Sequence, residues 1–149
     1  MSGFGESESL ERSKSSRSPA YERDRPKRKS GRVRVVINAK RRLVIATFGD
    51  HLTTADIRSY AQDLRIDPRF DSSFSEIADL RSLEELPFEA TDFLELADRI
   101  DPFSRESKRA FVARTPLQNN AARLHKMLRN QRNFEIFQTL EEAEAWIAV

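Results

Sequence analysis

Apolar positions along residues 32–149 alternate between two patterns, one typical of short β-strands and one of amphipathic helices. Runs rich in Val, Ile and Phe predict strands at residues 32–38, 43–48, 76–80, 109–113 and 134–137. The run at 43–48 is almost continuously apolar, as in strands that are covered on both faces of a sheet. A short polar turn between the first two runs predicts an antiparallel hairpin.

Four helical patterns separate or follow these strands. The first begins at Thr53 or Thr54 and ends before Pro68, with apolar residues at the spacing of one buried face. The second begins within residues 87–91 and ends at residues 101–102. The sequence Thr115-Pro116 predicts the N-cap and first residue of the third helix.

The third and fourth helices carry further local signals. We expect the third helix to bury one apolar face, made of Ala121, Leu124, Met127 and Leu128, with His125 partly exposed beside it. The sequence Thr139-Leu140-Glu141-Glu142 is a capping box, which predicts the start of the fourth helix.

The resulting order of elements is ββαβαβαβα. A strand–helix–strand unit joins parallel strands by a right-handed crossover. The pattern therefore predicts an α/β fold with a mixed, mostly parallel five-stranded sheet and about four helices.

The first 31 residues differ from the rest in composition. They hold few large apolar side chains, so we expect a disordered, Ser-rich tail at residues 1–31 before one domain at residues 32–149. Lys27, Arg28 and Lys29 lie in a basic run at the end of this tail. Such a run favours either weak contact with nucleic acid or another anionic surface, or a solvated linker without a partner.

Composition excludes several classes of protein. The chain of 149 residues contains no Cys, which excludes disulfides and thiolate chemistry and fits a cytoplasmic location. No apolar run approaches the ~20 residues of a transmembrane helix. Four glycines form no phosphate-binding or dinucleotide-binding motif, and His51 and His125 have no metal-ligand spacing. We therefore expect no metal site and no cofactor.

Candidate binding residues lie where the parallel strands end, which is where ligands bind in open α/β sheets. They are Asp79, Arg81, Arg114 and Thr115. Asp79 either holds the loop by pairing with Arg81 or Arg114, or orients a polar ligand. Ser82 lacks the glycine-rich elbow of a nucleophile, so we expect no catalytic residues and no enzyme activity.

The order and spacing of several short motifs resemble the SpoIIAA-like group of the STAS superfamily, small bacterial proteins of STAS/SEC14 type. The motifs lie at residues 49–57, 67–70, 79–81, 109–112, 122–127 and 140–147. The resemblance implies a partner-switching or ligand-sensing module rather than an enzyme.

One departure from that group concerns the helix after the Asp79-Leu80 strand. In the anti-sigma-factor-antagonist branch a phosphorylatable serine begins this helix, whereas here Phe88 and Glu89 occupy about that place. Glu89 is either a fixed negative charge that imitates the phosphorylated state or an ordinary acid of a helix N-terminus.

The leading hypothesis is a non-enzymatic regulatory or protein-interaction module, with Asp79, Arg81, Glu89, Arg114 and Thr115 as candidate contacts to an unidentified protein partner. The alternative is a carrier or sensor of a lipid or other small apolar anion, by analogy with SEC14-like proteins. There, Arg81 and Arg114 hold the head group. Phe88, Phe93, Phe103 and Phe111 are either core residues or the lining of a pocket for its tail.

Overall fold

The computed structural model describes residues 33–149, so the predictions for residues 1–31, including the basic run, lie outside the described residues. The predicted α/β fold is confirmed over this range. In chain order the elements are β1 (Val33–Asn38), β2 (Leu43–Phe48), α1 (Thr54–Ile66), β3 (Ser75–Asp79), α2 (Ala90–Glu95), β4 (Arg109–Val112), α3 (Pro116–Arg129), β5 (Phe134–Phe137) and α4 (Leu140–Ala148).

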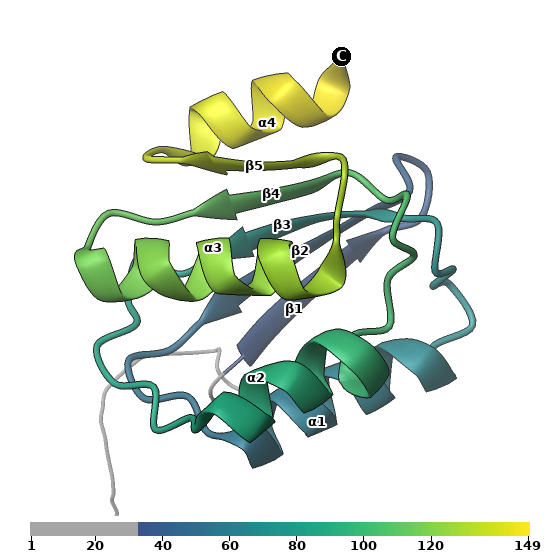
Figure 1. Ribbon diagram of the computed structural model, residues 1–149. Coiled ribbons are helices and arrows are strands. Elements are labelled where there is room, and N and C mark those ends of the chain that lie inside the picture. Colours follow the sequence, from purple (N-terminus) through teal and green to yellow (C-terminus); the bar gives the residue numbers. More distant parts are fainter. Residues whose placement is uncertain (1–32) are drawn as a thin grey trace, which may run out of the picture. The chain divides into compact units, whose positions relative to one another are not determined.

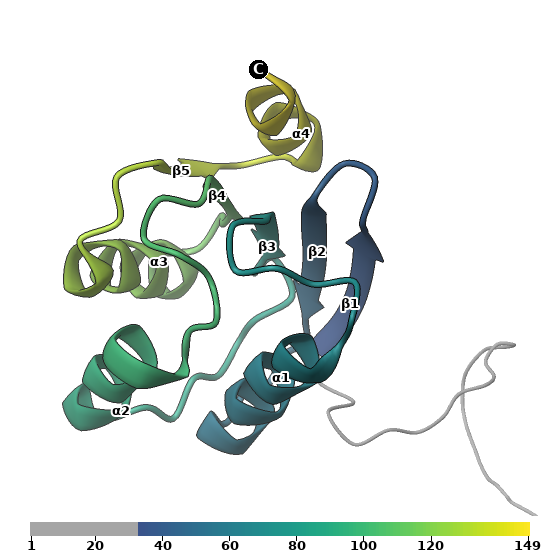
Figure 2. The same ribbon diagram turned by 90° about the vertical axis from the view of Figure 1, so that its right-hand side faces the viewer.

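The five strands form one sheet in the order β1-β2-β3-β4-β5. β1 is antiparallel to β2, and the other neighbours are parallel. Helices α1, α2 and α3 lie on one face of the sheet, and α4 lies on the other (Figures 1 and 2). The carboxyl ends of β2, β3 and β4 therefore lead into loops that join the sheet to the three-helix layer.

Side-chain caps fix the starts of α1, α3 and α4. Thr53, Thr115 and Thr139 each accept a hydrogen bond from the backbone N–H three residues later. The cap backbone N–H donates in turn to the side chain of that later residue, so each of these starts is a capping box. The box at Thr139 and the N-cap at Thr115 confirm the predictions from the sequence. These caps set where each helix leaves the sheet.

The second helix differs from the prediction of one regular helix. α2 is only six residues long and continues as a π-helix, Leu96–Ile100. The Asp101 N–H donates to the Leu96 carbonyl, five residues back, at 3.0 Å. The guanidinium of Arg129 donates a hydrogen bond to the Ala97 carbonyl at 3.0 Å. A buried arginine from α3 thus replaces a helical hydrogen bond, which local sequence patterns do not encode.

The predicted buried face of α3 is wrong in part. Met127 is 68% exposed, and the buried residues of this helix are Gln118, Ala122, His125 and Arg129. The expectation that His125 is partly exposed is therefore wrong too. Polar side chains turn inward here because each finds hydrogen-bond or charge partners in the layer between helices and sheet.

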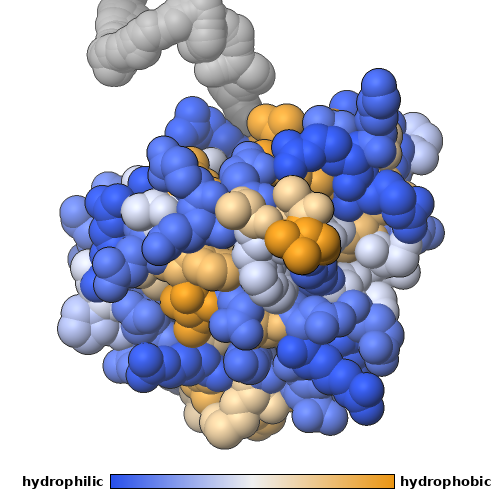
Figure 3. All heavy atoms as spheres, turned by 90° about the horizontal axis from the view of Figure 1, so that it is seen from above, coloured by the Kyte–Doolittle hydropathy of each residue, from blue (hydrophilic) through white to orange (hydrophobic). Residues whose placement is uncertain are grey.

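On the other face of the sheet, α4 covers a smaller core. Ala143 packs over Leu43, Ile77 and Val112, with Trp146 at the margin. Seen from the α4 side, the surface is largely hydrophilic, with hydrophobic side chains in small separate groups (Figure 3). Within residues 33–149, no helix is both long enough and apolar enough to span a bilayer.

A candidate ligand pocket over a buried charge network

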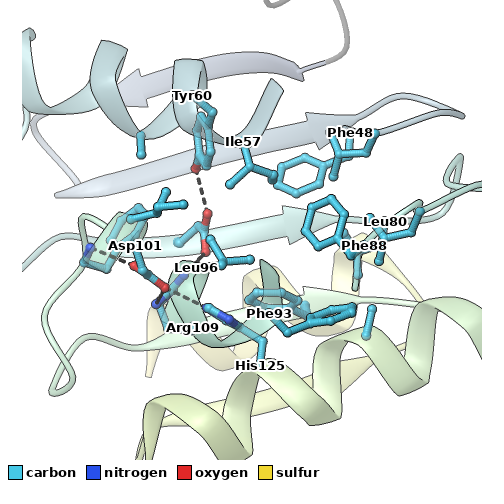
Figure 4. Close-up of a pocket in the computed structure, with 18 of the residues that line it drawn as sticks. Phe48, Ile57, Tyr60, Leu80, Phe88, Phe93, Leu96, Asp101, Arg109 and His125 are labelled. Atoms are coloured by element: carbon cyan, nitrogen blue, oxygen red, sulfur yellow. Dashed lines mark hydrogen bonds and ion pairs between the residues drawn. The ribbon is translucent and has the colours of Figure 1, made fainter. Parts of the chain in front are cut away.

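A pocket lies between the sheet and the layer formed by α1, α2 and α3. Its cavity volume is about 70 Å³. Most of its lining is apolar, and a few charged or polar side chains lie at one end (Figure 4). The lining residues are Phe48, Leu52, Ile57, Tyr60, Ala61, Glu76, Leu80, Leu83, Leu86, Phe88, Phe93, Leu96, Ile100, Asp101, Pro102, Phe103, Arg109, Phe111, Ala121 and His125.

The four phenylalanines weighed as either core or pocket residues, Phe88, Phe93, Phe103 and Phe111, all line this pocket. Phe103 and Phe111 are buried and also belong to the core, whereas Phe88 and Phe93 are only half-buried. The rings of Phe88 and Phe93 lie 5.2 Å apart. Phe103 and Phe111 thus form a buried wall of the pocket, whereas Phe88 and Phe93 lie on its solvent side.

Residues 83–100, which we call the cap segment, comprise the loop before α2, α2 itself and the π-helix. Near its start, the N–H groups of Glu84 and Glu85 donate to the Asp50 carbonyl at 2.8 and 2.9 Å. Near its end, Glu95 pairs with Arg58 of α1 at 2.6 Å. Between these points, residues 86–93 make hydrogen bonds only within the segment, in the part of the chain described here. Among residues 33–149, the middle of the cap segment is therefore held to the rest of the domain by apolar packing.

At the opposite end of the pocket lies a chain of buried charges. Tyr60 donates to Glu76 at 2.6 Å, and the guanidinium of Arg109 donates to the same carboxylate at 2.8 Å. Arg109 also pairs with Asp101 at 3.0 Å, and Nε2 of His125 lies 2.7 Å from that second carboxylate. The five side chains connect α1, β3, β4, α3 and Asp101, the residue that follows the cap segment.

The network stabilises the ionised forms of Asp101 and Arg109. Burial alone would raise the pKa of Asp101, but Arg109, His125 and Arg129 together lower it below the usual range. Burial alone would lower the pKa of Arg109, but the carboxylates of Asp101 and Glu76 raise it overall. Burial, with the neighbouring Glu76 charge, raises the pKa of Tyr60 well above its ordinary value, so this phenol stays neutral.

Two nitrogens in this region are buried without a hydrogen bond among the described residues. Nδ1 of His125 is one, and its side chain is only 8% exposed. The other is Nε of Arg129, which still lies 3.7 Å from the Asp101 carboxylate. The ring of His125 lines the pocket between Asp101 and the Phe93 side (Figure 4). Nδ1 itself has almost no accessible surface, so the ring contributes other atoms to the pocket lining.

Asp79 and Arg81, predicted from strand ends, form a pair outside the pocket. The Arg81 backbone N–H and guanidinium both donate to Asp79, at 3.1, 2.9 and 2.8 Å. Burial alone would raise the pKa of Asp79, but the hydrogen bonds from Arg81 and the nearby charge of Arg114 lower it overall. Asp79 is buried, so it orients the half-exposed Arg81 and is not itself accessible.

The remaining predicted residues are exposed and separate from the pocket. The guanidinium of Arg114 donates to the Gln138 carbonyl at 3.1 Å, and Thr115 caps α3. Glu89 is the N-cap residue of α2, and its backbone N–H donates to Asp92 at 2.8 Å. Arg81 and Arg114 do not line the cavity, so the pocket does not place a ligand head group between them.

Sequence patterns missed the buried network. Glu76, Arg109, Asp101 and His125 are far apart in the sequence, and each is of a type that usually lies at the surface. Tyr60 belongs to the face of the first helix that the sequence predicts to be buried, but no local signal identifies its partner. The one local signal is Arg109 at the start of an otherwise apolar strand. No group of three or more His, Cys, Asp or Glu side chains suited to a metal ion occurs within residues 33–149.

The chemistry available in the pocket is that of binding and proton exchange. His125 and Asp101 form a hydrogen-bonded pair of the kind used in general base catalysis. The lining contains no Ser, Thr, Cys or Lys that such a base could activate. The arrangement thus offers apolar contact beside a buried network of charges that pair with one another.

Comparison with solved structures identifies the fold as SpoIIAA-like. The chain is similar to an uncharacterized protein of the DUF3478 family from Shewanella loihica PV-4, described as having a SpoIIAA-like fold. The match has a TM-score of 0.55 and 18% sequence identity, and it covers 77% of this chain and 93% of the other. No family model and no curated protein matches the chain. The similarity confirms the predicted fold.

Proposed function

We propose that this domain is a non-enzymatic regulatory module that binds a small, largely apolar molecule in the pocket beneath the cap segment. The observation that carries the proposal is the pocket itself, with apolar walls and a buried, hydrogen-bonded polar end. Sites of this composition are typical of small-molecule binding.

The cap segment links the pocket to the surface. Leu86, Phe88 and Phe93 face the pocket, whereas Glu89 and Leu94 of the same segment are exposed, Leu94 by 53%. A ligand that packs against the inner side chains changes the stability of the segment that carries the outer ones. This continuity supports a sensor whose ligand controls contact with a protein partner in the cytoplasm.

The proposed partner surface is the outer side of α2 with the neighbouring Arg81, Arg114 and Thr115. Asp79 contributes by holding Arg81. Glu89 supplies negative charge at the N-terminus of α2, where it is electrostatically favourable. If Glu89→Lys, Arg81→Ala and Arg114→Ala all leave a cellular partner bound, this assignment of the surface is wrong.

A filled pocket tests the binding proposal. Ala121 of α3 lines the cavity, so Ala121→Leu should occupy part of it, whereas Ala145 is exposed on α4 and Ala145→Leu adds the same atoms outside. We expect 1-butanol and its isomer methyl propyl ether to shift the methyl NMR signals of Leu86 and Leu96 in the native protein. The shifts should persist in Ala145→Leu and disappear in Ala121→Leu.

The result that contradicts the proposal is equally direct. If neither compound shifts a pocket methyl signal in the native chain, or if Ala121→Leu binds both as the native chain does, the pocket is not a ligand site.

A further inference from the structure

Beside α4, the same side of the sheet carries apolar side chains that the helix does not cover. α4 packs mainly on β3, β4 and β5, and β1 is the edge strand at the far side of the sheet from β5. Val36 of β1 is the register partner of Ile45 of β2, and Ile45 packs against the core under α4, so both side chains lie on the α4 side. Val36 is 61% exposed and Ile45 is half-buried. We call these two residues the apolar strip.

The two sides of the apolar strip carry opposite charges. The hairpin of β1 and β2, residues 33–48, contains four basic residues and no acidic residue. The segment of β5 and α4, residues 134–149, contains four acidic residues and no basic residue. The basic residues are Arg34, Lys40, Arg41 and Arg42, and the acidic residues are Glu135, Glu141, Glu142 and Glu144. The hairpin side is therefore positive and the α4 side negative.

Part of this charge is neutralised within one chain. Arg41 pairs with Glu144 at 2.9 Å, where the hairpin turn meets α4. Arg34 and Glu141, in contrast, are exposed and form no ion pair with another residue of the described range 33–149. The nearest basic side chain that acts on Glu141 is Arg81, which is already bound in an ion pair within the chain. Arg34 and Glu141 thus remain available to a second molecule.

A second copy of the chain matches this distribution of charge. In a two-fold dimer the same surface meets itself, so its positive side has to meet its negative side. A two-fold axis parallel to the strands exchanges the two sides and preserves the position along the strands. The strand register leads from Arg34 across the sheet to Phe137, where β5 ends, and Glu141 lies just beyond in the first turn of α4. The rotation therefore brings Arg34 of each copy to Glu141 of the other.

We propose that this surface binds a second copy of the chain in a two-fold symmetric dimer, in which the apolar strip of each copy packs against α4 of the other and Arg34 pairs with Glu141. The surface lies on the opposite side of the sheet from the pocket, so the inference is independent of the proposed ligand. The strip is small and the ion pairs are at the surface, so we expect a reversible dimer with a micromolar dissociation constant.

Sedimentation equilibrium at a series of chain concentrations measures the association. We expect the mass to rise from one chain to two as the concentration passes through the micromolar range. Val36→Glu removes apolar contact and places a negative charge against the acidic α4 of the other copy, so it should abolish the dimer. Ile66→Glu is the matched control, because Ile66 is 68% exposed on α1, on the other side of the sheet. Circular dichroism checks that each variant is folded.

Exchange of the two charges tests the pairing itself. Arg34→Glu and Glu141→Arg each replace attraction by repulsion at two symmetric contacts, so each should weaken the dimer about tenfold or more. The double variant restores opposite charges, and we expect it to associate within about threefold of the native chain. Added salt should weaken the native dimer, because exposed ion pairs are screened.

Four results would overturn the inference. The mass of a single chain at concentrations up to about 1 mM removes the dimer. Equal effects of Val36→Glu and Ile66→Glu place the association elsewhere. A dimer weakened by Arg34→Glu but not by Glu141→Arg assigns the contact to the two β1 edges instead. A folded double variant that does not recover removes the pairing of Arg34 with Glu141 and the arrangement built on it.

Discussion

Asp101 is the residue on which the buried network depends most. Its carboxylate meets Arg109 at 3.0 Å and His125 at 2.7 Å, and its other oxygen accepts the Phe103 N–H at 2.9 Å. One side chain thus joins the end of the cap segment to β4 and α3. A neutral replacement leaves the buried guanidinium of Arg109 with less compensating charge.

We therefore predict that Asp101→Asn lowers the free energy of unfolding by about 3–5 kcal/mol, as expected when one partner of a buried ion pair is removed. Urea unfolding followed by circular dichroism measures this change. Asp98→Asn is the control, since Asp98 is exposed on the π-helix that ends just before Asp101 and should change stability by less than about 0.5 kcal/mol. Equal effects of the two variants would contradict the assigned role.

The same residue predicts how stability depends on pH. Its pKa is lowered in the folded protein from the ordinary 3.8, so the unfolded chain binds the proton first as the pH falls. The stability that Asp101 contributes is complete above about pH 4 and is lost as the pH falls toward the folded pKa. The native protein should thus lose stability more steeply than Asp101→Asn in acid, measured by urea unfolding at a series of pH values. Parallel pH profiles would be inconsistent with this account.

At the scale of elements, the cap segment combines weak attachment with a pocket-facing interior. Residues 86–93 have no hydrogen bond to another element within the described chain, whereas α1 and α3 are anchored by capping boxes and buried faces. The contrast rests on buried bonds between elements: Tyr60 of α1 donates to Glu76, and His125 of α3 pairs with Asp101. Segments with few hydrogen bonds to the rest of a protein open locally at lower free energy.

Hydrogen exchange tests this difference. Backbone amides of residues 86–93 should exchange faster than those in the middle of α1 and α3, and 1-butanol should slow them, because bound ligand stabilises the closed cap. Exchange in α4, on the opposite face of the sheet, should not change and provides the internal control. Ligand protection at α4 instead of residues 86–93 would place the site elsewhere.

The elements also mark where sequence reasoning succeeds. Strand runs such as Leu43–Phe48 and caps such as Thr115-Pro116 are local signals, and the structure places them as predicted. The π-helix and the inward face of α3 depend on two distant contacts: Arg129 donates to the Ala97 carbonyl, 32 residues away, and His125 pairs with the Asp101 carboxylate, 24 residues away. Local periodicity assigns such polar residues to the surface, so neither feature was predictable.

At the scale of the whole domain, the two faces of the sheet differ in what covers them. The α4 face is covered by a compact apolar core, while the face under α1, α2 and α3 combines the pocket, the charge network and the cap segment. The predicted candidate residues Asp79, Arg81, Arg114 and Thr115 follow or end strands and do not line the pocket, so their role stays a prediction. The pocket joins residues from many elements, so it required the three-dimensional structure.

The central claim is that the domain holds a small apolar molecule beneath the cap segment. Native mass spectrometry of the protein purified gently from its own host tests it most directly, with Ala121→Leu and Ala145→Leu prepared in the same way. We predict a small added mass on the native chain and on Ala145→Leu, and its absence from Ala121→Leu. A bare chain in all three preparations, or an added mass that Ala121→Leu retains, would contradict the account.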